Sequence, residues 1–268
     1  MGANMCEGLS VESINRFLHN PDPAQNIHIY PTVESTNTTA KEMAKAGAKH
    51  GAVVMAESQS LGRGRRGRSF FSPAGTGIYM SLVLKPIPPI PLTAFAAVSV
   101  CKAIENLTEK KPDIKWPNDL LLHGKKICGI LAESIGNNSE MPCVVVGIGI
   151  NFMNPAGSFP SEIEDTAGAI FSEGEPAISR NRLAAEIINR MTAKNLPPAK
   201  SILASYKSRM SMLGSPIKVI CPNETYEAIA QDVDLAGGLV VLKENGQKHN
   251  LTIGEITIRP KSSCNTSV

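Results

Sequence analysis

The chain has 268 residues, of which 42% are hydrophobic and 19% are charged, and its formal net charge is +3. These values are typical of a globular protein, the charge is too small to indicate nucleic-acid binding, and no apolar run reaches the ~18 residues of a membrane span. No secretory signal is recognisable at the N-terminus. Six cysteines stand far apart without a CxxC pair, which argues against a disulfide framework and a structural zinc site. We expect a cytoplasmic protein with one large and one small domain.

The first part of the chain predicts two helices. Residues 11–18 favour a short lead-in helix, and Ser35 or Thr36 is a suitable N-cap for a second helix that Gly47 ends. Capping alone explains a hydroxyl group at this position as well as ligand binding does. The local sequence therefore leaves both interpretations of Ser35 and Thr36 open.

Residues 62–68 hold four arginines and three glycines. This composition favours neither a helix nor a packed strand, so we predict a loop between strands at 51–58 and 77–86. Glycine lets backbone N–H groups approach an anion, and guanidinium groups donate in pairs to phosphate or carboxylate. The loop is therefore predicted to bind an anion. A solvated basic loop or an RNA-binding segment is the alternative.

A helix at 93–107 is followed by a predicted kink and a hairpin. Pro117 cannot donate a strand hydrogen bond, so Asn118 and Asp119 are expected at a kink. A hairpin should follow, with its turn at residues 123–124.

The next predicted strand, at 143–152, contains Gly147 and Gly149. Glycine is unfavourable inside a strand unless another group approaches the backbone closely. A bound ligand is the simplest reason, and close packing of the strand on a helix is the alternative.

The C-terminal third changes from helices to short strands. Residues 179–191 and 199–213 have helical apolar spacing, whereas residues 214–260 read as short strands joined by turns. We expect a small barrel there, followed by a frayed tail at 262–268.

Four separated motifs together resemble the biotin protein ligases: the Ser35-Thr36-Asn37 helix start, Gln59 with GRGRRG, KWPNDL with KICGIL, and GIGIN. The final GEITIRP is similar to the last strand of that family. The resemblance implies an α+β fold, in which a mixed β-sheet packs with helices in the class II synthetase-like manner and a small SH3-like β-barrel follows. It divides the chain into a lead-in at 1–26, a catalytic domain at 27–213, and a barrel with its tail at 214–268.

The resemblance also implies two groups of site residues. Lys126 and Arg65 are the expected catalytic residues, and Asp119 is the expected ligand of Mg²⁺. The biotin-binding residues would be Ser35, Thr36, Asn37, Gln59, Arg63, Gly64, Arg65, Tyr79, Lys126, Gly129 and Gly147. The ATP- and adenylate-binding residues would be Arg65, Arg68, Phe70, Asn118, Asp119 and Asn151. Phe70 departs from the family, because many relatives have tryptophan there as a surface for adenine; phenylalanine offers less area.

The implied reaction activates biotin with ATP to biotinyl-5′-AMP and then transfers biotin to a lysine of a biotin carboxyl carrier domain. The residues before the catalytic region are too few for the winged helix-turn-helix of the bifunctional relatives, so we expect the single-function type and no DNA as partner. The resemblance leaves a monomer and a homodimer both open. A lipoate or octanoyl ligase is the enzymatic alternative, and a non-enzymatic nucleic-acid-binding protein is the other.

Overall fold

The computed structural model describes residues 8–19, 27–85, 89–136, 143–221, 224–252 and 255–258. The tail predicted at 262–268 and both ends of the predicted lead-in at 1–26 lie outside these residues. Within the described ranges, no helix combines the length and the apolar character that crossing a bilayer requires.

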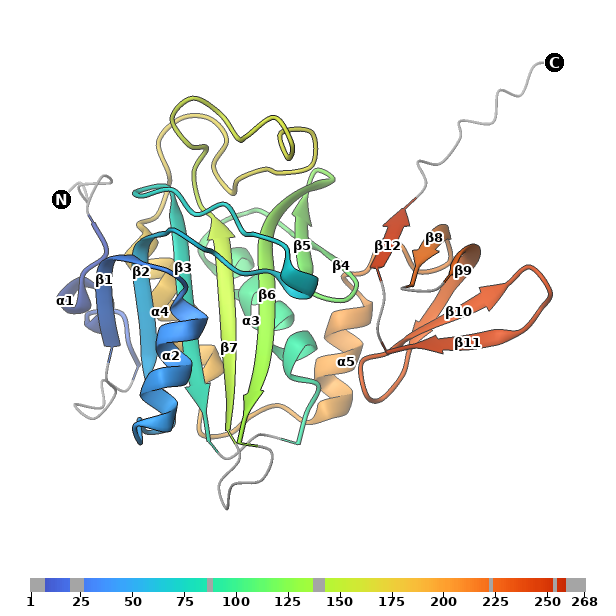
Figure 1. The fold of residues 1–268 in the computed structure, drawn as a ribbon, viewed down its shortest axis with the longest axis horizontal. Coiled ribbons are helices and arrows are strands. Elements are labelled where there is room, and N and C mark those ends of the chain that lie inside the picture. The colour runs from blue at the N-terminus through green and yellow to red at the C-terminus, as the bar shows by residue number, and fades with distance from the viewer. Residues whose placement is uncertain are drawn as a thin grey trace.

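A seven-stranded mixed sheet forms the centre of the large domain (Figure 1). Its strand order is β1-β2-β3-β7-β6-β5-β4, and neighbours are antiparallel except for the parallel pair of β1 and β2. The mixed sheet predicted from the sequence is confirmed. Its strands are β1 (Ile27–Val33), β2 (Val53–Gln59), β3 (Gly77–Leu84), β4 (Asp113–Lys115), β5 (Asp119–Leu122), β6 (Lys125–Ile135) and β7 (Cys143–Asn151).

Helices cover the two faces of this sheet unequally. One face packs against four helices in a single large core, and the other face packs only against α2. The helices are α1 (Val11–Asn15), α2 (Thr36–Lys45), α3 (Leu92–Leu107), α4 (Arg180–Met191) and α5 (Ala199–Lys207), with a short 3₁₀ turn η1 (Arg65–Gly67). The predicted helices are confirmed, although α5 ends earlier than the predicted 213.

Alternation along the strands separates the core from the rest of the sheet. Met80 and Val146 point into the large core, whereas their neighbours in sequence point to the opposite face. On that face Val83 and Val145 lie under α2. The part of this face that α2 does not cover is open, and it forms the floor of a pocket.

Strand β6 breaks the alternation once. Its pairing with β5 passes over Ile127, which makes this residue a β-bulge. Ile127 and Cys128 are therefore both buried in the large core. Lys126 consequently shares the open face with Gly129, whereas regular alternation would direct it into the core.

The small C-terminal unit is a five-stranded antiparallel sheet with the order β11-β10-β9-β8-β12. This confirms the predicted C-terminal β unit, and β12 lies in the final segment that resembles the family's last strand, although within the described residues β11 and β12 do not pair. Trp116 Nε1 donates a hydrogen bond of 3.0 Å to the carbonyl of Gly237, joining the unit to the large domain. Its strands are β8 (Pro216–Ile220), β9 (Thr225–Val233), β10 (Leu239–Lys243), β11 (Lys248–Leu251) and β12 (Glu255–Ile258).

The lead-in helix is packed into the large domain. Ser10 caps α1, and Ile14 is completely buried in the large core. Two asparagines of α4 hold the segment: Asn181 Oδ1 accepts from Ser10 N at 3.0 Å, and Asn189 Nδ2 donates to Phe17 O at 2.9 Å. The described part of the lead-in therefore contributes to the core on which the sheet rests.

Replacing Ile14 by alanine tests this contribution. Because the side chain is fully buried, we expect Ile14→Ala to lower the free energy of unfolding by about 2–5 kcal/mol. Val11→Ala on the exposed side of the same helix is the matched control and should change it by about 0.5 kcal/mol or less. Urea denaturation of the two variants makes the comparison, and equal small effects would show that the segment is dispensable for stability.

Candidate active site

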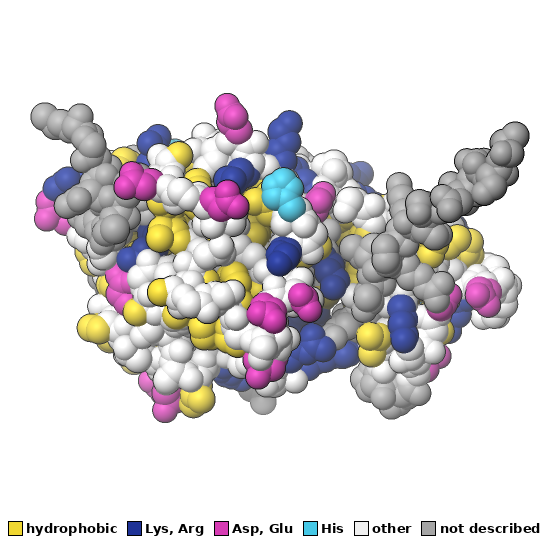
Figure 2. All heavy atoms as spheres, turned by 90° about the horizontal axis from the view of Figure 1, so that it is seen from above, with side chains coloured by type: hydrophobic (Ala, Val, Ile, Leu, Met, Phe, Trp, Pro, Cys, Tyr) yellow, Lys and Arg dark blue, Asp and Glu magenta, His cyan; other side chains and the backbone are white. Residues whose placement is uncertain are grey.

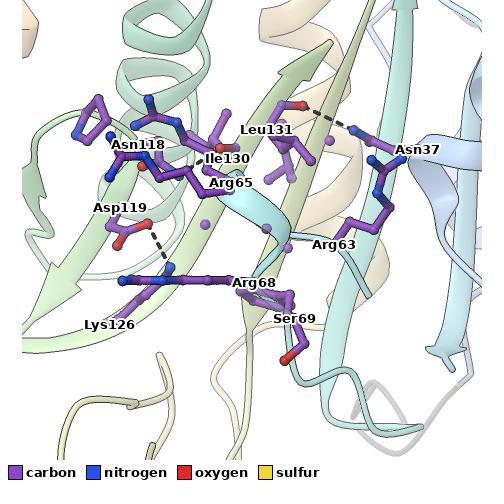
Figure 3. A pocket seen from close by; sticks show the side chains of 18 of the residues that line it. Asn37, Arg63, Arg65, Arg68, Ser69, Asn118, Asp119, Lys126, Ile130 and Leu131 are labelled. Carbon is purple, nitrogen blue, oxygen red and sulfur yellow. Dashed lines mark hydrogen bonds and ion pairs between the residues drawn. The ribbon is translucent and has the colours of Figure 1, made fainter. Parts of the chain in front are cut away.

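The open part of the sheet forms the floor of a pocket, and the arginine-glycine loop, residues 62–68, forms its rim (Figure 3). The pocket contains all eleven residues predicted for biotin. It also contains Arg68, Phe70, Asn118 and Asp119 from the adenylate group, but not Asn151. Seen from above, basic side chains gather on the middle of the molecule beside the C-terminal unit (Figure 2).

The start of α2 presents a hydroxyl group to the pocket. Ser35 is the N-cap residue, as predicted, yet its side chain makes no capping hydrogen bond. Gln59 caps the helix instead: its Oε1 accepts from Thr36 N at 2.9 Å and from Thr36 Oγ1 at 3.2 Å. Capping therefore does not explain the serine, and the buried Ser35 hydroxyl is available to a ligand.

Asn37 is held on the floor by three neighbours. Its Nδ2 donates to Leu131 O at 3.3 Å and to Glu133 Oε2 at 2.9 Å, and its Oδ1 accepts from Ser81 Oγ at 2.6 Å. A Cβ atom at position 147 would lie only 2.1 Å from Asn37 Oδ1. The group that requires Gly147 is thus a side chain from helix α2, as in the packing alternative of the sequence analysis.

Gly149 is required for a similar reason. A Cβ atom there would lie 2.7 Å from the Phe70 ring, which also approaches Gly129 and stands edge-on to Tyr79 with 6.4 Å between ring centres. Phe70 was predicted as a surface for adenine, but two of its neighbours, Gly129 and Tyr79, belong to the residues predicted for biotin. Burial raises the pKa of Tyr79, whose hydroxyl stays protonated and donates to Pro73 O at 2.9 Å.

The arginine-glycine loop has a defined backbone conformation. Arg63 and Ser69 form a β-bridge, Gly64 N donates to Arg68 O at 2.7 Å, and the 3₁₀ turn η1 lies between them. Arg66 has a φ of 56°, which is unfavourable for a residue with a side chain. The segment is a loop, as predicted, but it is a small hairpin with a strained tip.

Lys126 and Asp119 face each other in the pocket (Figure 3). Lys126 Nζ lies 2.8 Å from Asp119 Oδ1 and forms an ion pair with this buried oxygen, which accepts no further hydrogen bond from the described residues. The two groups predicted to hold a carboxylate and a metal thus pair with each other. A carboxylate oxygen in such a position is a suitable ligand for a cation.

The two asparagines predicted for the adenylate differ in position. Asn118 lines the pocket, and its Nδ2 donates to Ile130 O at 2.9 Å. Asn151 is buried, and its Nδ2 donates to Lys126 O at 3.3 Å and to Gly168 O at 2.9 Å. The structure therefore gives Asn151 a supporting position behind Lys126, because its amide is directed to backbone carbonyls and not into the pocket.

Two family descriptions match the chain in the expected order. Residues 29–151 match the Biotin/lipoate A/B protein ligase family, and residues 212–259 match the Biotin protein ligase C terminal domain. The bifunctional ligase/repressor BirA of Bacillus spizizenii is 33% identical over 252 residues, which cover 90% of this chain and 76% of that protein. The chain belongs to the biotin protein ligase family. The resemblance drawn from its motifs is confirmed.

Other biotin protein ligases agree in sequence and in fold. The biotin--[acetyl-CoA-carboxylase] ligase of Mycobacterium tuberculosis is 31% identical over 221 residues, covering 76% of this chain and 79% of that protein. The biotin protein ligase of Aquifex aeolicus, solved in complex with biotin and ATP, has a TM-score of 0.72 at 27% identity, with 88% of this chain and 99% of that chain covered. This similarity supports the ligase interpretation of the basic loop over the nucleic-acid one.

Sequence reasoning missed several residues that line this ligase pocket or that contact its lining. Ser81 carries a signal, because it is the only side-chain hydroxyl besides Tyr79 in β3 and alternation places both on one face. Glu133 on β6 carries a comparable signal, because it is a charged residue that alternation places on the same face as Leu131. Ile256 lines the pocket from the small sheet, and nothing in its local sequence points there. The remaining lining residues not predicted are Arg66, Ser69, Lys115, Trp116, Pro117, Ile130, Leu131, Ile148 and Gly149.

A double-mutant cycle tests the origin of Gly147. Gly147→Ala should lower the free energy of unfolding by about 1–3 kcal/mol, because the new methyl group overlaps the Asn37 side chain. In an Asn37→Ala background the overlap disappears, and the same substitution should cost less. Urea denaturation of the four proteins measures this difference. Equal costs in both backgrounds would show that another group requires the glycine.

Proposed function

We propose that this chain activates biotin with ATP to form biotinyl-5′-AMP and then transfers the biotinyl group to a lysine of a carrier domain. The charge of the pocket is the main support. Four arginines and two lysines line it against one carboxylate, and the part of its floor around Asn37 is polar but uncharged. Such a site suits a ligand with an uncharged polar end and an anionic end beside a polyphosphate.

In the first step the biotin carboxylate attacks the α-phosphorus of ATP, and pyrophosphate leaves. Both reactants are anions, so fixed cations must offset their repulsion and stabilise the charge that develops at phosphorus. We assign Lys126 to the carboxylate, which it would orient without taking a proton. Arg65 and Arg68 are assigned to the carboxyl-phosphate junction and the nucleotide. Arg63 and Gly64 would contribute their backbone to the biotin carboxylate.

Asp119 fits the role of a ligand for Mg²⁺. The ion is normally bound by one or two carboxylates together with phosphate oxygens, and Asp119 is the only carboxylate among the described residues that line the pocket, where it pairs with Lys126. No cluster of three or more candidate ligands occurs in the described residues, which agrees with a metal that arrives with ATP. When bound, Mg²⁺ supplies positive charge to the phosphates. Asn118 would lie beside the same nucleotide.

The polar floor favours biotin over lipoate. We assign Ser35, Thr36, Asn37 and Gln59 to the ureido ring, which presents two N–H donors and one carbonyl acceptor. A dithiolane ring has no such groups and would leave buried polar atoms unpaired, which discriminates strongly between substrates. The buried Ser81 supports Thr36 and Asn37 from beneath. Tyr79, Gly129, Gly147 and Phe70 would then enclose the apolar part of the bicyclic ring.

In the second step the acceptor lysine attacks the acyl carbon, and AMP leaves. We propose a biotin carboxyl carrier domain as acceptor, in line with the names of the related ligases. No DNA partner is proposed. We also propose a cytoplasmic location, which agrees with the consumption of ATP and with the buried free thiols of Cys101, Cys128 and Cys143.

The deciding experiment incubates the chain with biotin, Mg-ATP and a carrier domain and measures the mass of the carrier. We expect one added biotin that requires both biotin and ATP. Replacing biotin by lipoate tests the enzymatic alternative. A carrier that gains lipoate and no biotin would contradict the proposal.

Lys126 is the residue whose loss should affect the first step most directly. Lys126→Ala should weaken biotin binding and adenylation by about 2–4 kcal/mol, because the carboxylate loses its partner in a partly desolvated site. Lys125→Ala removes the same charge from the neighbouring exposed position and is the matched control. Calorimetric titration with biotin and pyrophosphate release measure the two effects. Equal behaviour of the two variants would remove Lys126 from the site.

Arg65 is proposed to retain the reactive intermediate. Arg65→Gly removes a charge-assisted contact but leaves Lys126, Gln59 and Asp119 in place, so adenylate should form and then escape. We expect faster release of biotinyl-5′-AMP and labelling of lysines on serum albumin. Arg66→Gly adds a glycine at the exposed tip of the same loop and should keep the adenylate bound. Release as slow as in the wild type would show that Arg65 is not the retaining residue.

A further inference from the structure

Glu133 stands just outside the pocket at the point where three parts of the site meet. On β6 it continues the row of Gly129 and Leu131 along the open face, and it pairs in register with Val145 on β7. Its side chain is 20% exposed. Glu133 belongs to β6, and side chains of helix α2 and of the arginine-glycine loop contact its carboxylate.

Three side chains contact it. Lys41 Nζ of α2 lies 2.5 Å from Glu133 Oε1, and Arg63 Nη2 of the loop lies 3.5 Å from the same oxygen. Asn37 Nδ2 donates to Glu133 Oε2 at 2.9 Å. Figure 3 shows Arg63 beside Asn37 at the Leu131 side of the pocket. One carboxylate therefore binds both a residue of the floor and a residue of the rim.

The charge state of Glu133 suits this arrangement. Partial burial acts to raise its pKa, but the hydrogen bonds from Lys41 and Asn37 and the charges of Lys41 and Arg63 act more strongly together and lower the pKa below its ordinary value. Glu133 is thus ionised at neutral pH. Its charge would be lost only as the pH falls through this lowered value, well below the range in which the reaction is measured.

Arg63 is the residue through which the loop can be positioned. It forms the β-bridge with Ser69, and Phe70 N next to that bridge donates to Gly62 O at 2.8 Å. Phe70 in turn lies on Gly149 and Gly129. Holding the Arg63 side chain consequently holds the base of the hairpin, and with it the ring that covers the floor.

We propose that Glu133 is a positioning residue for biotin: it orients the Asn37 amide on the floor and anchors the arginine-glycine loop through Arg63. The inference rests on the proposed function, because biotin is the ligand whose binding it explains. Glu133 itself does not line the pocket. It acts on the ureido end and the rim, and not on the nucleotide.

The test is the variant Glu133→Gln, which keeps the size and one acceptor oxygen but loses the charge. The KM for biotin should rise about tenfold, the loss expected for a charge-assisted hydrogen bond, whereas the KM for ATP should stay within about twofold. Glu105→Gln is the matched control, because it removes the charge of a similarly exposed carboxylate that pairs with Arg209 at 2.7 Å, between α3 and the segment after α5. It should leave both constants unchanged.

A double-mutant cycle with Arg63→Met tests whether Glu133 affects biotin binding through Arg63. If Glu133 acts through Arg63, the Arg63→Met variant should show much of the loss by itself, and adding Glu133→Gln should raise the biotin KM by much less than tenfold. Fully additive effects, or an unchanged biotin KM in Glu133→Gln, would overturn the inference. Arg63 is nearly half exposed, so its variant supplies a folded protein if Glu133→Gln is unstable. A wild-type protein without biotin-dependent pyrophosphate exchange would instead contradict the proposed function.

Discussion

A single sheet separates the hydrophobic core from the reactive pocket, and this two-sided constraint governs the rest of the structure. Successive side chains of a strand point to opposite faces. In β3, Met80 packs in the core, whereas Tyr79 lines the pocket and Ser81 supports its floor through Thr36 and Asn37. Residues that stabilise the core and residues that form the pocket therefore alternate along the same strands. Each substitution on one face is next in sequence to residues of the other face.

Side chains of the protein itself cover part of the pocket face. Asn37 lies on Gly147, and Phe70 lies on Gly149, so two side chains fill the space that these glycines open. Gln59 adds to this arrangement by capping α2, which leaves the Ser35 hydroxyl directed to the pocket. Binding groups are thus preorganised by contacts between protein groups, which lowers the entropy that a ligand must remove on binding.

Much of the fold was predictable from local signals, and most of the pocket residues were predictable from the resemblance of the motifs. The helix between Ser35 and Gly47 and the hairpin turn at His123 and Gly124 follow from capping and turn chemistry, and both occur as predicted. The parallel pairing of β1 was not predicted, since Pro31 interrupts its strand pattern and pairing between distant segments leaves no local signal. Asn151 was assigned by motif alone, and only the structure shows that its amide faces the backbone behind Lys126.

The bulge at Ile127 has a consequence for how this segment tolerates insertions and deletions. Lys126 and Gly129 are an odd number of positions apart, yet they share a face, because one extra residue lies between them. Regular pairing through all four residues would turn the lysine toward the apolar core, whereas deleting the extra residue would restore regular alternation and leave the lysine on the pocket face. The direction of the lysine therefore depends on the bulge only while four residues span this segment, so the pocket would tolerate loss of the extra residue better than a strand that pairs regularly through it.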